Sequence, residues 1–594
     1  MAERYRADVL VSCLHDRAPD LIPALEAEVE RRGLEGEVRV VEAGCRGFCS
    51  MGPVLLIQPN GIFYVGVQPA DVPELVEETL VKGRVVERLT YKEPTTHACI
   101  AYCDDIPFYS KQVRIVLRHC GLVNPASVEE YIAVGGYQAL GKVLTSMAPE
   151  EVIEEIKKSG LRGRGGAGFS TGRKWEAGRK AEGEIKYVLA NGDEGDPNCF
   201  MDRALMEADP HSILEGLIIG AYAVGAHQGF IYIPFEHTRA VRSMRNAVEQ
   251  AQEYGLLGED ILGSGFDFDA ELRLGAHSFV GGESTALMHA VEGKASEPRP
   301  KHIHTTEKGV WDRPSCLNNV KTLSIVPEII NRGAEWYAGI GTETSKGTQV
   351  FSLAGKVNNV GLAEVPMGTT VRELVFDVGG GVPKGREFKA IQIGGPSGGF
   401  LPASLLDMPM DYETLAEAGS MMGTGGVIVL DDRTCVVDTA RYFLDFLQDE
   451  SCGKCAPCRE GVKRMLEILT RITDGQGEMA DLETLEALGR VVKLISLCGL
   501  GKTAPNPVLS GLRYFRDEYV AHIVDHECPA GVCKALIEYY IIEDKCTGCG
   551  LCLRKCPQEA ISGEKKEPHA IDPALCIKCG VCFDVCKFDA VGVR

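Results

Sequence analysis

Apolar residues near the start of the chain form short runs that read as buried strands. These runs cover residues 7–13, 38–42 and 54–58. The pair Asn60-Gly61 after the third run is a hairpin signal, and residues 18–32 carry apolar positions at helical spacing. A strand, a helix, a second strand and then a hairpin predict a small α/β domain over residues 1–92.

A second alternation of strands and helices follows a connecting arm at residues 93–148. The pattern predicts an acidic amphipathic helix at 149–158, a strand at 185–190, an apolar helix at 212–225 and a strand at 229–234. Strands that alternate with helices are typical of a parallel sheet covered on both faces. We therefore predict an α/β domain over residues 149–344.

The pattern changes twice more toward the carboxyl terminus. Residues 345–430 hold short apolar runs separated by glycine and proline, which predict short strands. Residues 431–535 turn helical, with the clearest helical run at 482–497, and residues 536–594 are rich in cysteine. The chain as a whole reads as a multidomain α/β protein.

Composition and charge narrow the function. At 594 residues the chain exceeds what one hydrophobic core organises, and a net charge of −21 disfavours a nucleic acid or an anionic membrane as partner. The apolar runs are too short to cross a bilayer and the first residues lack a signal-peptide core, so we expect a cytoplasmic protein without direct membrane insertion. In that compartment the 23 cysteines are not expected to form a disulfide framework.

Residues 161–175 (LRGRGGAGFSTGRKW) concentrate glycines and cations. Glycine lets a backbone approach a ligand closely, while bare N–H groups and cations suit a phosphate. The glycines at 163, 165 and 168 satisfy the spacing GxGxxG. A predicted helix precedes them, however, where the dinucleotide fingerprint requires a strand. The stretch indicates a phosphate ligand, and a flexible surface loop is the alternative.

The cysteines of the tail repeat the spacing CxxCxxCxxxC. In two-cluster ferredoxin domains the fourth cysteine of each run binds the other cluster. The pattern thus predicts one [4Fe–4S] cluster on Cys546, Cys549, Cys552 and Cys586, and a second on Cys576, Cys579, Cys582 and Cys556. Lys587 stands where a proline usually follows the last ligand.

A third cysteine group opens the helical region. The CxxCxxC spacing of Cys452, Cys455 and Cys458 places three thiolates on one turn, and Cys498 is the candidate fourth ligand. Four thiolates make a [4Fe–4S] site. Zinc is the alternative, which the two further clusters disfavour.

His522, Cys528 and Cys533 lie between the helical region and the tail, and Cys435 is an unassigned cysteine near the start of that region. One imidazole and three thiolates suit zinc. We favour a structural Zn²⁺ here over free buried cysteines, and such a metal would act as a hinge for the tail.

Three further cysteines lie in the amino-terminal domain, at Cys13, Cys45 and Cys49. The domain resembles the thioredoxin-like [2Fe–2S] ferredoxin, which carries two cysteines on an early loop and two on a later one. Arg17 and Ala18 stand where the second early ligand is expected. Either the three thiolates hold a [2Fe–2S] cluster with His15 or Asp16, or the domain docks partners without a metal. We favour the second alternative.

Several motifs together carry a resemblance over almost the whole chain: the glycine stretch, NGDEGDP with MDR at 191–203, FVGGESTALMHAVEGK at 279–294 and LNNVKTL at 317–323. They resemble the FMN- and NADH-binding subunit of respiratory complex I. With its amino-terminal domain and its tail, the chain is more similar to the flavin subunit of soluble, electron-bifurcating NAD(P)-linked [FeFe] hydrogenases and related formate dehydrogenases.

This resemblance implies an α/β multidomain fold with six parts. They are a thioredoxin-like domain (1–92), a connecting arm (93–148), a Rossmann-like FMN and NAD(P) domain (149–344), a β-grasp, ubiquitin-like insert (345–430), a helical bundle with a [4Fe–4S] cluster and a zinc site (431–535) and a ferredoxin domain with two [4Fe–4S] clusters (536–594).

The resemblance also implies which residues hold the cofactors. No side chain would act as a nucleophile, because FMN carries the chemistry. Phe169 and Phe279 would stack on the nucleotide, with packing in the core as the alternative. The expected residues are Gly163, Arg164, Gly165, Gly166, Gly168, Phe169, Lys174, Asn191, Asp193, Glu194, Asp196, Phe279, Gly282, Glu283, Ser284, His304, Asn318, Asn319 and Thr322.

The sequence departs from the family pattern in the pocket for the nicotinamide nucleotide. The family usually carries two glutamates where Glu283 and Ser284 stand, and an aromatic residue where His304 stands. The second glutamate is expected to repel a 2′-phosphate, by about 4 kcal/mol for two unit charges about 4 Å apart at an effective dielectric of about 20. Other basic or polar residues nearby are Lys301, His302 and Lys308. We expect NADP(H) use, and a pocket that no longer binds nucleotide is the alternative.

We therefore expect a diaphorase subunit that moves electrons between NAD(P)(H), FMN and three [4Fe–4S] clusters. The implied partners are a small [2Fe–2S] thioredoxin-like subunit, a catalytic hydrogenase or formate dehydrogenase subunit, and ferredoxin. Electron bifurcation is a further hypothesis, because two-electron and one-electron carriers meet on one chain. An electron relay without nucleotide binding is the alternative function. The tail and the amino-terminal domain disfavour a complex I peripheral subunit.

Overall fold

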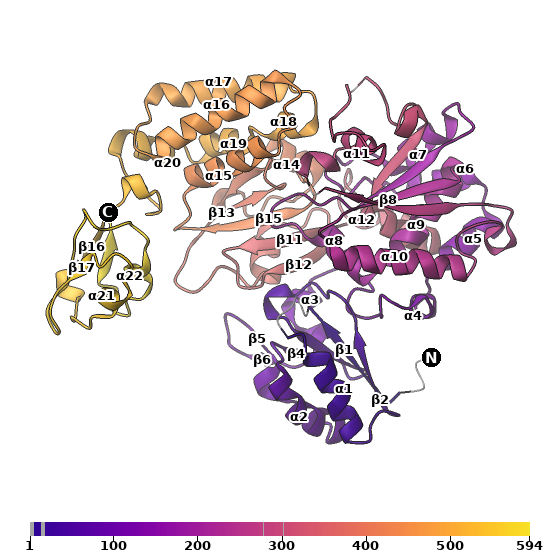
Figure 1. Cartoon of the computed structure of the whole chain (residues 1–594), viewed down its shortest axis with the longest axis horizontal. Coiled ribbons are helices and arrows are strands. Elements are labelled where there is room, and N and C mark those ends of the chain that lie inside the picture. Colours follow the sequence, from indigo (N-terminus) through magenta and orange to yellow (C-terminus); the bar gives the residue numbers. More distant parts are fainter. Residues whose placement is uncertain (1–4, 14–17, 277, 301) are drawn as a thin grey trace. The chain divides into compact units, whose positions relative to one another are not determined.

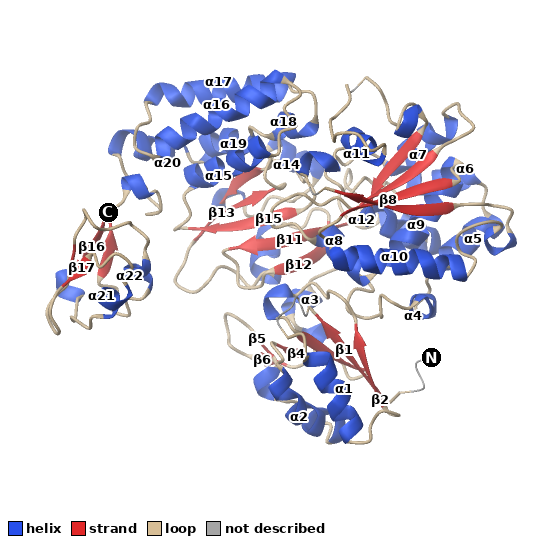
Figure 2. Ribbon diagram, viewed as in Figure 1, coloured by secondary structure: helices blue, strands red, loops and turns tan. Residues whose placement is uncertain are grey.

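The structure is a computed structural model that describes residues 5–13, 18–276, 278–300 and 302–594. The chain forms two compact units: residues 1–429 with 497–500, and residues 430–496 with 501–594. Figure 1 follows the chain by colour, and Figure 2 separates helices from strands.

The amino-terminal domain is a four-stranded sheet with helices on one face. Its elements are β1 (Ala7–Ser12), α1 (Leu21–Arg31), β2 (Val38–Glu42), β3 (Val54–Gln58), β4 (Ile62–Val65) and α2 (Val72–Leu75). The order is β2-β1-β3-β4, with β2 parallel and β3 antiparallel to β1. Val9 and Val11 pack under α1, whereas Leu10 faces the other way and joins the main core. This order supports the thioredoxin-like assignment, which stays a prediction.

The connecting arm and the start of the next domain are mostly helical. Their elements are β5 (Tyr91–Lys92), β6 (Cys99–Ile100), α3 (Pro107–Ser110), α4 (Val128–Ala133), α5 (Gln138–Ser146), α6 (Pro149–Lys158) and α7 (Thr171–Lys180). The acidic helix before the glycine stretch is thus confirmed as α6, and α7 begins directly after that stretch.

A parallel sheet lies at the centre of the first unit. Its strands are β7 (Tyr187–Asn191), β8 (Gln228–Pro234), β9 (Asp269–Gly275) and β10 (Ser315–Asn319), in the order β10-β7-β8-β9. Its helices are α8 (Met201–Ala208), α9 (Pro210–Val224), α10 (Thr238–Glu253), α11 (Ser284–Val291), α12 (Val320–Arg332) and α13 (Ala334–Ala338). Ile231 and Ile233 of β8 face the core that includes α9 and α12, while Phe230 and Tyr232 face α11. Both faces are covered, as the sequence pattern predicts.

A mixed five-stranded sheet follows. Its strands are β11 (Thr348–Gly355), β12 (Gly361–Pro366), β13 (Phe388–Ile393), β14 (Gly399–Pro402) and β15 (Gly426–Asp431), in the order β12-β11-β15-β13-β14. The helical turn η9 (Glu373–Val378) lies between β12 and β13, and α14 (Tyr412–Glu417) lies between β14 and β15. The central strands β11 and β15 run parallel, and β11 and β12 run antiparallel. The strand order supports the β-grasp prediction without testing it.

The second unit begins with amphipathic helices. They are α15 (Val436–Asp449), α16 (Ala456–Thr473), α17 (Met479–Ile495), α19 (Asn506–Tyr514) and α20 (Arg516–Val520), while α18 (Gly499–Thr503) spans the boundary between the units. On α16 the apolar residues Val462, Met465 and Leu469 are fully buried at helical spacing. The helical prediction for this region is confirmed.

The tail repeats one small motif twice. Its elements are β16 (Tyr539–Ile541), α21 (Leu551–Lys555), β17 (Ile561–Ser562), β18 (Ala570–Ile571), α22 (Val581–Asp584) and β19 (Val591–Val593). The outer strands β16 and β19 pair antiparallel, as do β17 and β18. The small core between them includes Cys552 and Cys582, one cysteine from each repeat.

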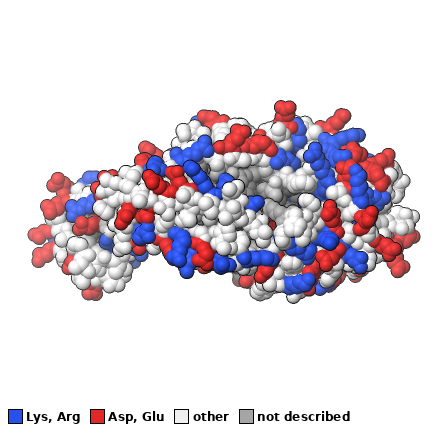
Figure 3. Space-filling view, turned by 90° about the horizontal axis from the view of Figure 1, so that it is seen from above, with Lys and Arg blue, Asp and Glu red and all other residues white. Residues whose placement is uncertain are grey.

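The surface mixes charges of both signs. Figure 3 shows lysine and arginine side chains interspersed with aspartate and glutamate over the face that it draws. Among the described residues, no helix combines the length and the apolar composition that a membrane span requires.

Candidate functional site

The carboxyl ends of β7 and β10 bring predicted site residues together. Asn191 and Asn319 are neighbours in the parallel register. The Asn191 amide donates to the carbonyl of Gly282 (3.0 Å), and its oxygen accepts from the Asp193 N–H (2.9 Å). The Trp175 indole N–H donates to the oxygen of Asn318 (2.9 Å). In open parallel sheets this edge is where ligands bind, and we call this edge, where the predicted residues meet, the crevice.

The glycine stretch forms a closed loop on this crevice. The Gly163 N–H donates to the carbonyl of Phe169 (2.8 Å), which closes the loop at its base. A Cβ atom at Gly165 would lie 3.0 Å from Cβ of Asn319, and Gly168 has a φ of +61°. The amides of Gly165 and Gly168 donate to no acceptor within the part of the chain that the structure describes. An anchored loop with open amides is suited to an anion.

The cations of the loop serve the protein itself. The Arg164 side chain is fully buried, and its guanidinium donates to the carbonyls of Thr348 (2.8 Å), Arg162 (2.6 Å) and Lys346 (2.6 Å) and to the hydroxyl of Tyr337 (2.9 Å). Four of its five N–H groups are thereby engaged. The guanidinium of Arg164 is thus held within the protein, and the place of Arg164 among the cofactor-binding residues stays a prediction.

Lys174 is similarly occupied, because its ammonium donates to the carbonyl of Leu317 (2.7 Å). Burial also lowers the pKa of Lys174 below its ordinary value. The Arg164 backbone N–H donates to the hydroxyl of Thr322 (2.9 Å), so Thr322 positions the loop.

A buried charged cluster lines the same crevice. The Lys321 ammonium lies 2.6 Å from Asp202, and the Asn319 amide donates to the other oxygen of that carboxylate (2.5 Å). Glu194 accepts from the N–H groups of Asp202 (3.1 Å) and Arg203 (3.0 Å). The motifs MDR and LNNVKTL contain Asp202 and Lys321, but neither residue was expected to have a role from the sequence.

Burial controls the protonation of two acids in this cluster. Burial and the charge of Asp202 raise the pKa of Glu194 to about 7, against the opposing charge of Lys321. Burial raises the pKa of Asp196 to about 6, although a hydrogen bond from the Thr424 hydroxyl opposes the shift. Glu194 therefore exchanges a proton near neutral pH.

The predicted nucleotide residues lie around the start of α11. The Glu283 carboxylate caps this helix by accepting from the N–H groups of Thr285 (2.8 Å) and Ala286 (3.1 Å). Ser284 and Phe279 are half-buried. His302, His304 and Lys308 are not buried, and Lys301 lies outside the described residues. Phe169 is 57% exposed, so packing in the core is excluded for that ring.

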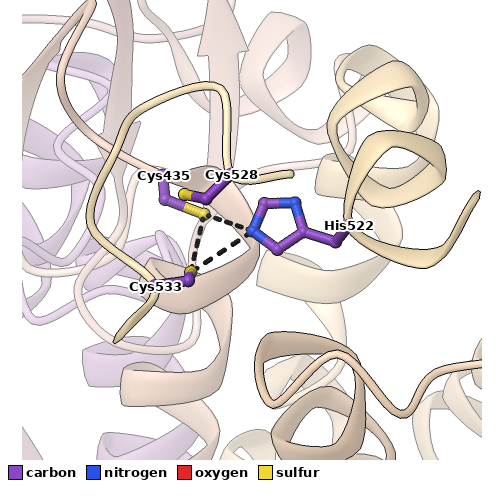
Figure 4. A group of neighbouring side chains, drawn as sticks. All are labelled: Cys435, His522, Cys528 and Cys533. Carbon is purple, nitrogen blue, oxygen red and sulfur yellow. Dashed lines mark hydrogen bonds between the residues drawn. The ribbon is translucent and has the colours of Figure 1, made fainter. Parts of the chain in front are cut away.

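Four predicted zinc ligands converge in the second unit, as Figure 4 shows. Cys435 stands directly before α15, His522 lies in the helical turn after α20, and Cys528 and Cys533 lie on the loop that follows. His522 Nε2 is 3.4 Å from Sγ of Cys435 and 3.3 Å from Sγ of Cys533, and the two sulfurs are 3.7 Å apart. All four ligand atoms lie within 4.8 Å of one another.

The quartet fits zinc in geometry and in chemistry. Ligands around a tetrahedral zinc with arms of about 2.1–2.3 Å lie about 3.4–3.8 Å apart. His522 Nδ1 lies 2.7 Å from the carbonyl of Glu518, so it acts as the donor and leaves Nε2 to bind metal. Hydrogen bonds from Cys435 and Cys533 hold the pKa of Cys528 below its usual range, and the thiolate is the form of cysteine that binds a metal.

The eight tail cysteines divide into two groups of four. One small cavity is lined by Cys546, Cys549, Cys552 and Cys586. A second is lined by Cys556, Cys576, Cys579 and Cys582. Each cavity therefore takes three cysteines from one repeat and the last from the other, which is the grouping that the spacing predicts.

Three predicted cluster ligands lie at the start of α16. Cys455 is the residue directly before this helix, Cys458 is buried and Cys452 is half-buried. The Ser451 hydroxyl lies 3.3 Å from Sγ of Cys458. Cys498 is buried, and its role as the fourth ligand stays a prediction.

Cys13, Cys45 and Cys49 also lie together, with sulfurs 3.9 Å apart from Cys13 to Cys45 and from Cys45 to Cys49. Hydrogen bonding with Cys13 and Cys49, together with burial, raises the pKa of Cys45 above its usual range. The candidate fourth ligands His15 and Asp16 lie outside the described residues.

Known protein families match three regions of the chain. Residues 156–328 match the Nuo51 FMN-binding domain, residues 438–522 match the NADH-ubiquinone oxidoreductase-F iron-sulfur binding region, and residues 545–590 match a 4Fe-4S dicluster domain. These regions hold the crevice, the helical bundle and the tail.

Whole-chain relatives agree with these matches. NADP-reducing hydrogenase subunit HndC of Solidesulfovibrio fructosivorans is 55% identical over 81% of this chain and 98% of its own length. The F 2 component of NADH-quinone oxidoreductase in Rhizobium meliloti (strain 1021) is 44% identical over 70% of this chain and 99% of its own length. A crystal structure of an NAD⁺-reducing [NiFe]-hydrogenase is similar with a TM-score of 0.61 and 26% identity, over 88% of this chain and 85% of that one. The chain therefore belongs to the family of 51 kDa-type flavin and iron–sulfur oxidoreductase subunits that includes these hydrogenase and NADH-quinone oxidoreductase proteins.

Proposed function

We propose that the chain is the diaphorase subunit of an NADP(H)-linked hydrogenase complex and binds FMN in the crevice at the ends of β7 and β10. The observation that carries this proposal is the anchored glycine loop, which has open amides at Gly165 and Gly168 and in which Gly165 lies beside Asn319. The relative HndC, named as a subunit of an NADP-reducing hydrogenase, supports the nucleotide and the partner.

The residues present fit FMN. Backbone N–H groups of the loop suit the phosphate, and carboxylates such as Asp193 and Asp196 would accept hydrogen bonds from ribityl hydroxyls. When bound, FMN supplies the redox chemistry by exchanging electron pairs with a nicotinamide and single electrons with iron–sulfur clusters. The protein would bind FMN and would order the water molecules and charged side chains around it. Glu194, whose pKa is about 7, is placed to hold a proton in the crevice.

Ser284 supports the use of NADP(H). A serine at this position carries no negative charge to repel a 2′-phosphate, and the accessible His302, His304 and Lys308 lie on the segment that follows α11. Glu283 keeps its carboxylate at the start of α11, where the ribose of a nucleotide would be held.

The cysteine groups complete an electron path. The tail would hold two [4Fe–4S] clusters, and Cys452, Cys455 and Cys458 would hold a third with Cys498. The quartet of Cys435, His522, Cys528 and Cys533 would hold a structural zinc. The amino-terminal trio would hold a [2Fe–2S] cluster or no metal, and the domain around it would dock a partner.

The partners we propose are a small [2Fe–2S] thioredoxin-like subunit and a catalytic hydrogenase subunit, with ferredoxin exchanging electrons at the tail. A formate dehydrogenase subunit is the alternative catalytic partner, and electron bifurcation would follow if ferredoxin and the nucleotide were reduced together.

The decisive experiment is anaerobic purification of the full chain with its flavin measured, followed by titration with NADPH and with NADH. The proposal expects stoichiometric FMN that NADPH bleaches at least as efficiently as NADH. Bleaching by NADH alone would contradict the proposed nucleotide. A protein with iron and sulfide but no flavin would be the electron relay instead.

A further inference from the structure

Residues of the five-stranded sheet domain stabilise the conformation of the glycine loop. The Arg162 guanidinium donates to the carbonyl of Gly168 (2.7 Å), next to the bond between Gly163 and Phe169 that closes the loop at its base. The same guanidinium donates to the carboxylate of Glu413 (2.6 Å) and lies 4.1 Å from the centre of the Tyr412 ring. Tyr412 and Glu413 belong to α14, in the five-stranded sheet domain, about 250 residues along the chain from Arg162.

Tyr412 also contacts the loop directly. Its hydroxyl donates to the carbonyl of Gly163 (2.9 Å), so it holds the first glycine while Arg162 holds the last. A Cβ atom at Gly168 would lie 2.7 Å from the Tyr412 ring. The ring therefore occupies the volume that any side chain at position 168 would need, in addition to the positive φ found there.

Helix α14 is itself fixed firmly enough to act as a template. The Asp411 carboxylate caps it by accepting from the N–H groups of Glu413 (3.1 Å) and Thr414 (2.9 Å). Glu413 also accepts from the hydroxyls of Thr344 (2.9 Å) and Ser345 (3.1 Å). Each of these bonds is local to α14 or to the segment just before the sheet, so the template does not depend on a bound ligand.

We propose that Tyr412, acting with Arg162 and Glu413, is a positioning residue for FMN. The three residues, which we call the α14 clamp, set the loop so that the open amides of Gly165 and Gly168 converge on one anion. The clamp acts through the loop and needs no contact with the flavin. This inference rests on the proposed function that the loop binds FMN, and it assigns the sheet domain a part in cofactor retention.

The test uses the full chain freed of FMN, with the dissociation constant of added FMN measured by quenching of its fluorescence. Tyr412→Phe removes the bond to Gly163 and is expected to weaken FMN binding about threefold to tenfold, the size of one hydrogen bond. Tyr412→Ala also removes the ring beneath Arg162 and is expected to weaken it about tenfold to a hundredfold. Arg162→Lys keeps the charge but loses the fork geometry, and an intermediate effect is expected.

Tyr254→Phe is the matched control, because the half-exposed Tyr254 also donates a hydrogen bond, to Glu129, far along the chain from the loop. Excess FMN separates positioning from folding: it is expected to restore the kcat of Tyr412→Ala while iron and sulfide content stay at the wild-type level. The double variant with Arg162→Lys and Tyr412→Ala is expected to bind FMN no more weakly than the weaker-binding of the two single variants.

Three outcomes would overturn the inference. Tyr412→Ala that binds FMN as tightly as the wild type would exclude positioning by the clamp. Activity that excess FMN does not restore, with iron lost in parallel, would mean that Tyr412 only supports the fold. Absence of FMN from the wild type would remove the proposed function and this inference together, whereas full FMN affinity in every variant removes this inference alone.

Discussion

Lys321 and Asp202 form a buried ion pair that organises the polar side of the crevice. Both side chains are almost fully excluded from solvent, and Asp202 also accepts from the amide of Asn319. Removing one partner of a buried pair leaves an uncompensated charge, which typically costs about 3–5 kcal/mol. This pair keeps a positive charge next to Glu194, and that charge opposes the rise of the Glu194 pKa.

We predict that Glu194 makes stability fall as pH rises toward neutrality. Burial raises the pKa of Glu194 from 4.5 to about 7, so between these values the folded state keeps a proton that the unfolded state has released. Stability contributed by that proton is present below pH 4.5, is lost as pH rises through 7, and is constant above. Relative to Glu194→Gln, the wild type is expected to lose up to about 3 kcal/mol over this range.

Thermal unfolding of both proteins across this pH range measures the effect. Asp196 titrates in both proteins, so its contribution cancels in the comparison. If the stability of the wild type and of Glu194→Gln changed with pH in the same way, Glu194 would already be ionised in the folded protein over this range. That result would contradict the prediction.

Ser284 gives a second prediction at the scale of one residue. Ser284→Glu places a carboxylate next to Glu283 and is expected to lower kcat/KM for NADPH about tenfold to a thousandfold, because it repels the 2′-phosphate. NADH carries no such phosphate and should lose little. Ser284→Gln, which adds the bulk without the charge, is the control. Equal losses for NADPH and NADH in Ser284→Glu would place the 2′-phosphate elsewhere.

Among the secondary structure elements, the turn after α20 and the start of α15 meet at the quartet of Cys435, His522, Cys528 and Cys533. We predict that His522→Ala and Cys528→Ser each remove about one zinc ion per chain and lower the unfolding temperature of the helical unit, because a structural zinc contributes directly to folding. Metal analysis and calorimetry measure the two effects. Cys99→Ser, at an exposed cysteine of β6, should change neither. If wild-type protein purified without zinc had the same unfolding temperature as protein that contains zinc, the result would favour free cysteines.

The two repeats of the tail lead to a prediction about cluster assignment. Cys556 lines a cavity with cysteines of the second repeat, and Cys586 lines one with cysteines of the first. Cys556→Ala and Cys586→Ala are therefore expected to remove different [4Fe–4S] clusters, each with about four iron atoms. Electron paramagnetic resonance of the reduced variants distinguishes the two signals. Loss of the same signal in both variants would mean that each repeat binds its own cluster.

Helices α1, α6 and α9 and strands β1, β2, β3, β7 and β8 of the first unit were predicted because their apolar periodicity is strong. Strand β9 was not predicted, since as an edge strand it carries the charged residues Glu271 and Arg273 and lacks a clear apolar run. The α14 helix was missed as well. It is short, and its importance comes from what it contacts rather than from its composition.

Over the whole molecule, the grouping of cysteines was easier to predict than the contacts of the side chains near the proposed cofactor site. Cysteine and histidine are rare and chemically specific, so spacing alone grouped the tail cysteines, and ligand chemistry added the unassigned Cys435 to His522, Cys528 and Cys533, as the structure does. Arg162 and Arg164 were harder. Their long side chains donate hydrogen bonds to Glu413 and Thr348, which are 251 and 184 residues away in sequence. No local sequence pattern indicates which distant residue such a side chain contacts.

The central claim is that FMN in the crevice links a nicotinamide nucleotide to the iron–sulfur clusters of the same chain. It is tested most directly by adding NADPH anaerobically to the purified chain while flavin absorbance and iron–sulfur electron paramagnetic resonance are recorded together. The account predicts that the flavin band bleaches and that reduced [4Fe–4S] signals appear in the same sample. Reduced clusters without a flavin band, or a bleached flavin with the clusters still oxidised, would contradict it.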